Sequence, residues 1–221
     1  MAQIIIVGYQ NYDFAKSLVV GEILYKDFCL DVQVFDGLIF TSKNAILSLE
    51  KNSIKYPQMQ RWRSIPAYVI GQSSAKMLQN LGGNLAYISS NAHGKEFANE
   101  LSQLLDKRKK YAYFRAYKIV SNLDKELRER DFCVHSIVSY QSVPANLSQT
   151  DLPPKGSVLL FTSPSAYHFF LQKFQWDESY RAVALGKTTF NAFRQGIKAE
   201  ILQIQEIYKA TLFLQEKFKE G

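Results

Sequence analysis

The sequence has few of the residues that mark extracellular, metal-binding or membrane proteins. Its only cysteines are Cys29 and Cys133, and without an export signal we expect both to be free thiols. Its three histidines have no ligand spacing, so we expect no metal site. No apolar run approaches the roughly 20 residues of a membrane helix, and "MAQIIIVGY" lacks the basic start of a signal peptide. We therefore expect an unprocessed cytoplasmic protein that binds no membrane.

Motifs for nucleotide or nucleic-acid binding are also missing. The sequence has no GxGxxG fingerprint and no P-loop, which disfavours a dinucleotide or ATP. No zinc-finger, homeodomain or RNP pattern accompanies the formal net charge of +7. The densest basic cluster, "DKRKK" at 106–110, is typical of a solvated helix end. We therefore expect an anionic small molecule as the partner, no nucleic acid and no cofactor.

Three short signatures occur twice in the same order. They are "DFC" at 27–29 and 131–133, "FTS" at 40–42 and 161–163, and G-x-[ST]-[ST] at 71–74 and 186–189. Any one match is weak, but three in the same order indicate a duplicated unit.

Apolar strands alternate with amphipathic helices in both copies, which is typical of parallel α/β sheets. In each copy a strand that contains DFC follows the first helix. The strand that runs into FTS (the FTS strand) and the strand that runs into G-x-[ST]-[ST] (the glycine strand) each lead into a helix. The opening strands are expected at 3–8 and 111–115, and further helices near 13–26, 94–108, 121–130 and 206–219. This order predicts an α/β protein with two similar lobes, each a parallel sheet flanked by helices.

Each duplicated motif joins an apolar strand to a hydroxyl residue and a helix. The candidate N-caps are Ser42, Ser163, one of Ser73 and Ser74, and one of Thr188 and Thr189. Gly82 and Gly196 stand where the helices after the glycine strands should end. The carboxyl ends of parallel strands form the ligand face, and helix N-termini there attract anions. Two such lobes facing each other would form a cleft suited to a ligand with several carboxylates or phosphates.

Five stretches resemble the uroporphyrinogen-III synthase family. They are "DGLIFTSKNAI" at 36–46, "AYVIGQSSAKMLQNLG" at 67–82, "VSYQSV" at 138–143, "LLFTSPSAYHFF" at 159–170 and "AVALGKTTFNAFRQG" at 182–196. The resemblance implies two α/β lobes joined by two connecting segments, with the active site in the cleft between them. It also implies a discontinuous lobe, about 1–35 with 147–221, and a middle lobe, about 36–146. The repeat alone does not distinguish this arrangement from two consecutive lobes.

The resemblance implies a lyase of haem biosynthesis. Members of the family dehydrate hydroxymethylbilane, a linear tetrapyrrole with an acetate and a propionate on every ring, and close it to uroporphyrinogen III. The last pyrrole ring is attacked at its substituted carbon, and a spiro intermediate allows this ring, ring D, to be inverted. We expect catalysis to come mainly from holding one conformation and from electrostatic stabilisation.

The same resemblance singles out candidate site residues. Tyr140, in "VSYQSV", is the candidate catalytic residue, because a phenol can donate to the departing oxygen without carrying charge. A role for Tyr140 in packing alone is the competing interpretation. The candidate substrate-binding residues are Ser42, Lys43, Gly71, Ser74, Ser163, Lys187, Thr188 and Thr189. Their backbone N–H groups are expected to matter more than their hydroxyls, and the two lysines could reach carboxylates.

The sequence departs from the family pattern at three places. Lys43 stands where many members have proline, Arg115 is followed by Ala116 instead of glycine, and "VGYQ" lacks the arginine often found after the first strand. The alternative function is a non-catalytic, two-lobed binding protein for a small polyanion, and a nucleic-acid binder is a third hypothesis. Since the sequence has no heptad repeat or interface stripe, we expect a monomer.

Overall fold

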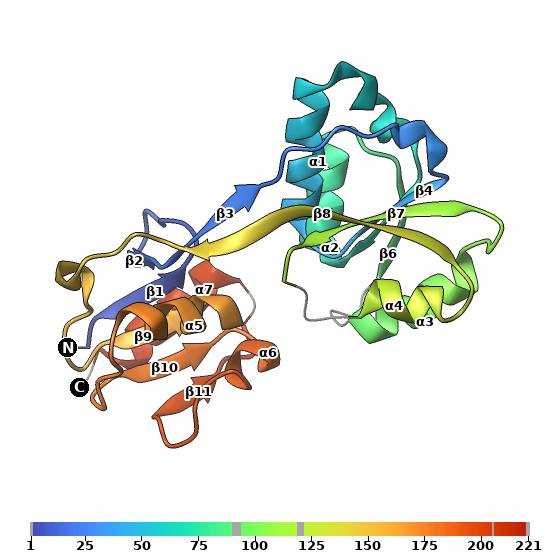
Figure 1. Ribbon diagram of the computed structural model, residues 1–221. Helices are drawn as coiled ribbons and strands as arrows, with labels where there is room; N and C mark the ends of the chain where they lie inside the picture. The colour runs from blue at the N-terminus through green and yellow to red at the C-terminus, as the bar shows by residue number, and fades with distance from the viewer. Residues whose placement is uncertain (1, 90–93, 119–121, 205, 220–221) are drawn as a thin grey trace. The chain divides into compact units, whose positions relative to one another are not determined.

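The computed structural model describes residues 2–89, 94–118, 122–204 and 206–219, which form two compact units (Figure 1). Unit 1 comprises Met1–Glu22 and Val143–Gly221, and unit 2 comprises Ile23–Ser142. The chain passes between the units twice, once within strand β3 (Gly21–Tyr25) and once within strand β8 (Cys133–Pro144). Each unit has its own sheet and its own helices.

Unit 1 is built on a five-stranded sheet in the order β11-β10-β9-β1-β2, with all neighbouring strands parallel. Its strands are β1 (Ile4–Gly8), β2 (Lys16–Val19), β9 (Val158–Phe161), β10 (Arg181–Ala184) and β11 (Ala199–Ile201). Its helices are α5 (Pro164–Lys173), α6 (Lys187–Phe190), α7 (Ile207–Lys217) and the short η3 (Gln149–Asp151). The N-terminal strand β1, drawn in blue, therefore pairs with β9 from the C-terminal part of the chain (Figure 1).

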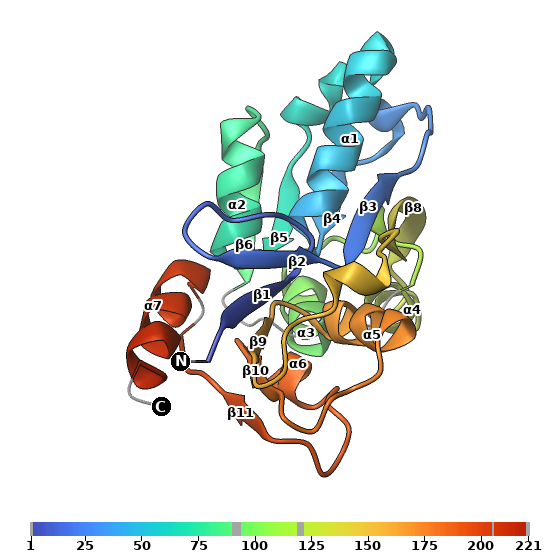
Figure 2. The same ribbon diagram turned by 90° about the vertical axis from the view of Figure 1, so that its left-hand side faces the viewer.

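Both faces of the unit 1 sheet are covered. Ile5 and Val7 of β1 belong to the core cluster that includes residues of α5, whereas Ile4 and Ile6 pack in the cluster with residues of α7. Figure 2 shows α5 and α7 on opposite sides of β1. Burial on both faces explains why this strand is a continuous apolar run and does not alternate.

Unit 2 is built on a six-stranded sheet in the order β3-β8-β7-β4-β5-β6. Strands β4 (Gly37–Phe40), β5 (Ala67–Ile70), β6 (Leu85–Ser89) and β7 (Lys110–Ala116) form parallel pairs with their neighbours, and β7 also pairs in parallel with β8. The helices are α1 (Lys43–Lys55), α2 (Gly71–Asn80), α3 (Gly94–Leu104) and α4 (Leu123–Arg128), with the 3-10 helices η1 (Val32–Val34) and η2 (Pro57–Ser64). Leu38 and Phe40 of β4 share a core cluster with residues of α1 and α2, and Ile39 shares the opposite cluster with residues of α3 and α4.

The two sheets have the same strand order over five positions. The FTS strands β9 and β4 are central, with the glycine strands β10 and β5 on one side and the opening strands β1 and β7 on the other. In the sequence, β1 and β2 belong to the same copy as β4, β5 and β6. Each sheet therefore combines the opening strands of one copy with the later strands of the other. This confirms the predicted α/β fold with two similar units and parallel sheets.

The units divide after Glu22 and after Ser142. The sequence-based boundaries, after residues 35 and 146, lie later in the chain at both crossings. Residues 23–35 fall in unit 2 because β3 neighbours β8 and the Lys26 N–H donates to the Ser139 carbonyl at 2.8 Å. Val32 is fully buried in the same core cluster as Leu38. Strand pairing and burial thus attach this segment to the middle unit.

The predicted helix near 13–26 is wrong, because β2 and β3 occupy this region. The run "SLVVGEILY" is rich in β-branched residues, and Gly21 lies in close contact with two aromatic rings. A Cβ at Gly21 would approach Tyr9 Cε1 to 2.7 Å and Phe169 Cδ2 to 2.8 Å. The first DFC, 27–29, is not in a strand either, whereas Cys133 of the second DFC begins β8.

The predicted opening strands and the three other helices are confirmed, with bounds that differ by a few residues and with β7 longer than expected. The opening strands are β1 and β7, and the helices near 94–108, 121–130 and 206–219 are α3, α4 and α7. None of the helices in the described part of the chain is long and apolar enough to cross a membrane.

Candidate functional site

Three of the candidate residues lie along the carboxyl edge of the unit 2 sheet. The register aligns the ends of β4, β5 and β7, and it pairs Ala116, the last residue of β7, with Tyr140. Ser42 lies two residues after the end of β4, and Gly71 directly follows β5. In parallel α/β sheets this edge is the ligand face. The structure therefore brings Ser42, Gly71 and Tyr140 to one edge of one unit.

Ser42 is the N-cap of α1, as predicted. Its Oγ accepts a hydrogen bond from the Asn44 N–H at 3.2 Å. Lys43, the first residue of the helix, is exposed. Thr41 places a second hydroxyl beside Ser42, with its Oγ1 3.2 Å from the Tyr113 hydroxyl. The positive end of a helix of 13 residues thus lies at the sheet edge with hydroxyls around it.

Gly71 starts α2 directly at the end of β5, without a side-chain cap. Its φ of +74° lies in the left-handed region, and a Cβ there would meet no atom within 4 Å. Glycine is therefore favoured by backbone conformation and not by lack of space. The prediction that Ser73 or Ser74 caps this helix is wrong, because the helix begins before both. Ser74 is buried within the first turns of α2.

The helix end predicted at Gly82 is confirmed. Gly82 has a φ of +75° two residues after the last residue of α2, and its N–H donates to the Gln79 carbonyl at 2.9 Å. This is the conformation that commonly ends a helix.

Tyr140 directly follows a β-bulge in β8. The pairing with β7 shifts from Arg115–Val138 to Ala116–Tyr140, so that Ser139 is the extra residue. As a result Tyr140 packs in the same core cluster as Ile137, three residues earlier, where a regular strand would turn it to the other face. Tyr140 is 9% exposed, and the chain enters unit 1 after Ser142. The bulge therefore decides which face of unit 2 carries this phenol.

The other candidate residues of the two motifs in unit 1, namely Ser163, Lys187, Thr188 and Thr189, follow strands at the carboxyl edge of the unit 1 sheet. The register aligns Val7 of β1 and Ala184 of β10 with Phe161 of β9. Ser163 follows β9 after one residue, and Lys187 follows β10 after two. Both duplicated motifs of this unit therefore reach one edge.

Ser163 is the N-cap of α5, as predicted, and it belongs to a chain of hydroxyls. Its Oγ accepts from the Ala166 N–H at 3.2 Å, and Pro164 is the first helical residue. The Tyr9 hydroxyl donates to Ser165 Oγ at 2.6 Å, and Ser165 Oγ lies 3.1 Å from Ser163 Oγ. Tyr9 and Ser165 were not among the residues predicted for the site from the sequence. The available signal was the place of Tyr9, which directly follows the first strand and so must lie at the same edge.

The second motif of unit 1 forms only a short helix, α6, whose N-cap Gly186 makes no side-chain cap. The prediction that Thr188 or Thr189 caps this helix is therefore wrong, since both lie inside it. Lys187 and Thr188 are exposed, and Thr189 is buried. The helix end predicted at Gly196 is also wrong, because α6 already ends at Phe190.

Arg115 lies near the carboxyl end of β7 in unit 2, and its positive charge contributes to a lowered pKa of Asp124. Arg115 Nη1 donates to the Ala116 carbonyl at 2.9 Å. Burial raises the pKa of Asp124, but a hydrogen bond from Ser136 and the charges of Arg128 and Arg115 outweigh it and hold the pKa below its ordinary value.

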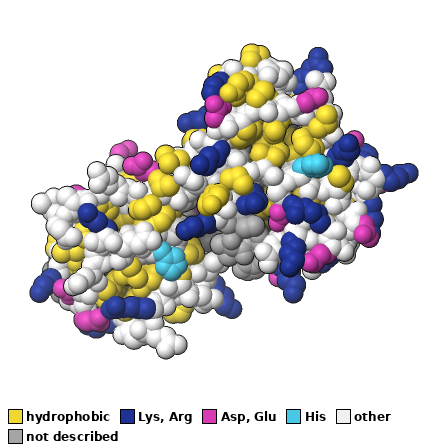
Figure 3. All heavy atoms as spheres, in the orientation of Figure 1, with side chains coloured by type: hydrophobic (Ala, Val, Ile, Leu, Met, Phe, Trp, Pro, Cys, Tyr) yellow, Lys and Arg dark blue, Asp and Glu magenta, His cyan; other side chains and the backbone are white. Residues whose placement is uncertain are grey.

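On the face drawn in Figure 3, lysine and arginine side chains are spread over both units and form no single dominant patch. Among the described residues, no group of three or more His, Cys, Asp and Glu side chains could hold a metal ion.

Residues 23–203 match the family model described as uroporphyrinogen-III synthase HemD. The chain belongs to the uroporphyrinogen-III synthase family. The matched region contains all five stretches on which the resemblance was based.

Solved structures of uroporphyrinogen-III synthases share the fold. The chain is similar to uroporphyrinogen-III synthetase from Helicobacter pylori 26695, with 32% identity, a TM-score of 0.84 and coverage of 98% of this chain and 99% of that chain. A mutant uroporphyrinogen III synthase from Thermus thermophilus gives a TM-score of 0.65 at 15% identity, with 100% of both chains covered. The wild-type Thermus enzyme gives 0.54 at 13% identity, with 100% and 99% covered. At these identities the Thermus structures show the fold alone. A search of curated protein sequences found no match.

Membership of the uroporphyrinogen-III synthase family confirms the predicted activity class. The chain is a lyase of haem biosynthesis, in a family whose substrate is hydroxymethylbilane and whose product is uroporphyrinogen III. The comparisons give no support to a non-catalytic binding protein.

Proposed function

We propose that this uroporphyrinogen-III synthase uses Tyr140 as the proton donor to the departing hydroxyl group of hydroxymethylbilane. The observation that carries the proposal is the bulge at Ser139, which sets Tyr140 level with the carboxyl end of β7. Bulges are common next to active sites, where they re-aim a side chain.

The proposed step balances without a cofactor. The Tyr140 phenol gives its proton to the hydroxyl as the C–O bond breaks, so that water departs and the pyrrole that carried the hydroxymethyl group becomes an electrophilic azafulvenium cation. Ring D attacks through its substituted carbon, and the spiro intermediate opens and closes again with the ring inverted. The proton lost when the last pyrrole ring regains its aromaticity balances the one that Tyr140 donates.

We also propose that the carboxyl edge of each sheet binds carboxylates of the substrate. The proposed substrate-binding residues are Ser42, Lys43, Gly71, Ser74, Ser163, Lys187, Thr188 and Thr189. Exposed Lys43, Lys187 and Thr188 offer charge or a hydroxyl directly. Ser74 and Thr189 are buried, so their side chains support the backbone that offers N–H donors. Such fixed donors hold one conformation of a flexible polyanion, which is what the choice of the type III isomer requires.

Tyr140→Phe tests the catalytic role. Freshly prepared hydroxymethylbilane is supplied, and type I and type III products are separated over time. We expect type III formation to fall about 100-fold, within the range of a lost general acid, while circular dichroism stays unchanged. Tyr117→Phe is the matched control, because Tyr117 is exposed just after β7 and should keep the wild-type rate. A wild-type rate in Tyr140→Phe would reduce Tyr140 to a packing residue.

We propose in addition that the enzyme works as a cytoplasmic monomer without a cofactor. Light scattering after gel filtration should give the mass of one chain, and dialysis against a chelator should leave the rate of type III formation unchanged. A dimer mass, or a rate abolished by the chelator and restored by a metal ion, would contradict these two points. Cell fractionation that leaves the protein outside the cytoplasmic fraction would contradict the third.

A further inference from the structure

A buried serine of α1 contacts the bulge that precedes Tyr140. Ser48 is fully buried, and its Oγ donates to the Ser139 carbonyl oxygen at 2.6 Å. Its nearest buried neighbours along the helix are apolar, namely Ala45, Ile46 and Leu49. This hydroxyl is therefore a polar group that follows an apolar stretch of the core face of α1.

The hydrogen bond of Ser48 is not the one that a helical serine usually makes. A serine inside a helix commonly bonds the carbonyl three or four residues earlier in the same helix. Ser48 instead bonds a strand residue 91 positions later in the chain. Burying a hydroxyl costs free energy unless it is hydrogen-bonded. The buried Ser48 hydroxyl therefore needs the Ser139 carbonyl as its acceptor, and this carbonyl in turn gains a donor from Ser48.

Ser139, the extra residue of the bulge, is held at three points. Its carbonyl accepts from Ser48 Oγ and from the Lys26 N–H at 2.8 Å, and its own Oγ donates to the Arg115 carbonyl at 3.3 Å. Two of these contacts come from neighbouring strand segments, and only that of Ser48 comes from a side chain of another element. Removal of the Ser48 hydroxyl would leave the carbonyl with a single donor in a buried place.

One helical turn further along α1, a second polar side chain holds the segment that follows β3. Asn52 Nδ2 donates to the Lys26 carbonyl at 3.0 Å and to the Ser48 carbonyl at 2.8 Å, and Asn52 Oδ1 accepts from the Phe28 N–H at 2.9 Å. Lys26, whose N–H donates to the Ser139 carbonyl, is thus itself bonded to α1 through Asn52. Helix α1 therefore fixes both the bulge and the chain beside it.

We infer that Ser48 is a positioning residue for the reaction: by holding the Ser139 bulge, it sets the face and the height at which Tyr140 meets the substrate. The inference rests on the proposed catalytic role of Tyr140. Since Ser48 acts through the backbone of its neighbour strand, it is expected to change turnover more than substrate binding.

The test compares Ser48→Ala with Ser53→Ala. Ser53 is also fully buried on α1, but its Oγ donates to the Glu50 carbonyl at 2.8 Å, within its own helix. Rates are compared per folded enzyme, measured by circular dichroism. We expect Ser48→Ala to lower kcat roughly tenfold, because small displacements of catalytic groups are costly, with little change in KM and a larger share of type I product. Ser53→Ala should keep the wild-type kcat, and Ser48→Cys, which keeps a weak donor, should recover part of the loss.

A double-mutant cycle separates this inference from the proposed role of Tyr140. In the Tyr140→Phe background, Ser48→Ala should lower kcat less than about twofold, because its effect passes through the missing phenol. Independent, multiplicative losses would overturn the positioning role, and so would equal rates for Ser48→Ala and Ser53→Ala. A wild-type rate in Tyr140→Phe would overturn both proposals, whereas a slow Tyr140→Phe with a normal Ser48→Ala would overturn only this one.

Discussion

The two FTS helices have similar starts and differ in what supports them. Helices α1 and α5 both begin after a central strand with a serine N-cap. In unit 2 the segment after the helix is η2, which carries Trp62, and in unit 1 it is an irregular segment that carries Trp176. Polar side chains of α1 bond Trp62 and Arg63 of η2, whereas aromatic rings surround Trp176 in the other segment. Two similar helix starts, at the carboxyl edges of two different sheets, are thus followed by segments with different side-chain contacts.

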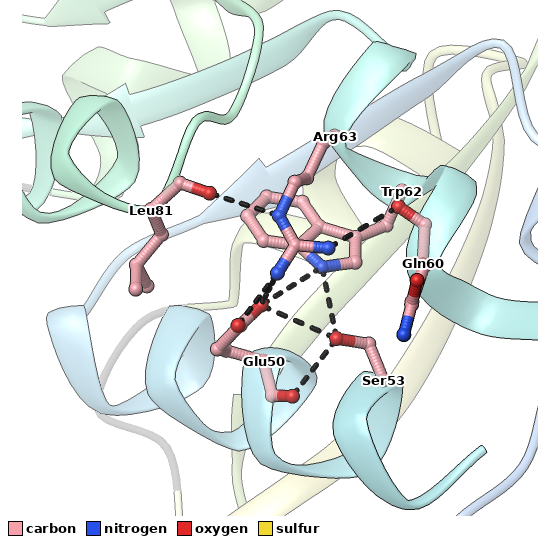
Figure 4. Close-up of polar contacts among 6 residues, drawn as sticks. All are labelled: Glu50, Ser53, Gln60, Trp62, Arg63 and Leu81. Carbon is pink, nitrogen blue, oxygen red and sulfur yellow. Dashed lines mark hydrogen bonds and ion pairs between the residues drawn. The ribbon is translucent and has the colours of Figure 1, made fainter. Parts of the chain in front are cut away.

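In unit 2, polar side chains attach η2 to α1 (Figure 4). Arg63 Nη2 lies 2.6 Å from both carboxylate oxygens of Glu50, and Arg63 Nε donates to the Leu81 carbonyl at 2.9 Å. The Trp62 Nε1–H lies within 3.3 Å of Glu50 Oε2 and of Ser53 Oγ. Figure 4 shows these groups converging on Glu50 from η2. One arginine thus connects α1, η2 and the end of α2.

In unit 1, the segment after α5 packs its tryptophan, Trp176, among aromatic side chains. Trp176 lies 5.5 Å from the Tyr180 ring and 6.1 Å from the Phe170 ring, between ring centroids. Its Nε1 is buried and has no hydrogen-bond partner within the described part of the chain. The Tyr180 hydroxyl donates to the Pro153 carbonyl at 2.5 Å. Ring packing around Trp176 thus accompanies polar contacts of the same segment, such as Arg194 Nη2 with Glu178 Oε1 at 2.7 Å.

The largest difference between the units should come from their arginine–glutamate pairs. In the Arg63–Glu50 pair the side chains are 33% and 15% exposed, whereas in Arg194–Glu178 of unit 1 they are 47% and 74% exposed. Arg63→Met leaves Glu50 partly buried without its partner, so we expect a loss of about 2 kcal/mol in the free energy of unfolding. Arg194→Met should cost less than about 1 kcal/mol, as is usual for an exposed pair. Urea unfolding checks both, and equal losses would contradict the distinction.

The serine caps and most strands were predictable because they depend on local sequence. A serine between an apolar strand and an amphipathic helix specifies an N-cap by its own hydrogen bond, as Ser42 and Ser163 do. The region 13–26 was mistaken because its burial depends on distant partners, among them Phe169 beside Gly21. The bulge at Ser139 was not predictable, since it depends on the register between β7 and β8. Nor was the contact from Ser48, which pairs two residues with no local relation.

A smaller and more equal effect is expected at the two caps. Ser42→Ala and Ser163→Ala each remove a hydroxyl that accepts one backbone N–H, so each should lose about 1 kcal/mol in the free energy of unfolding. Ser53→Ala is the control for a serine inside a helix, where no cap is lost. If the caps serve only stability, neither change alters KM at a temperature where the protein stays folded. A raised KM in both variants, absent from Ser53→Ala, would support the proposal that both edges bind the substrate.

The two tryptophans should differ by the weak hydrogen bonds that only Trp62 makes. Trp62→Phe removes a donor to Glu50 and Ser53, whereas Trp176→Phe removes an N–H that has no partner among the described residues. Both changes lose similar packing, but only the first breaks hydrogen bonds, and the 3.3 Å separations make these weak. We expect Trp62→Phe to cost roughly 1 kcal/mol more than Trp176→Phe in urea unfolding. If Trp176→Phe proves the more costly of the two, aromatic packing in unit 1 outweighs the polar contacts of unit 2, and the contrast between the two interiors would have to be reversed.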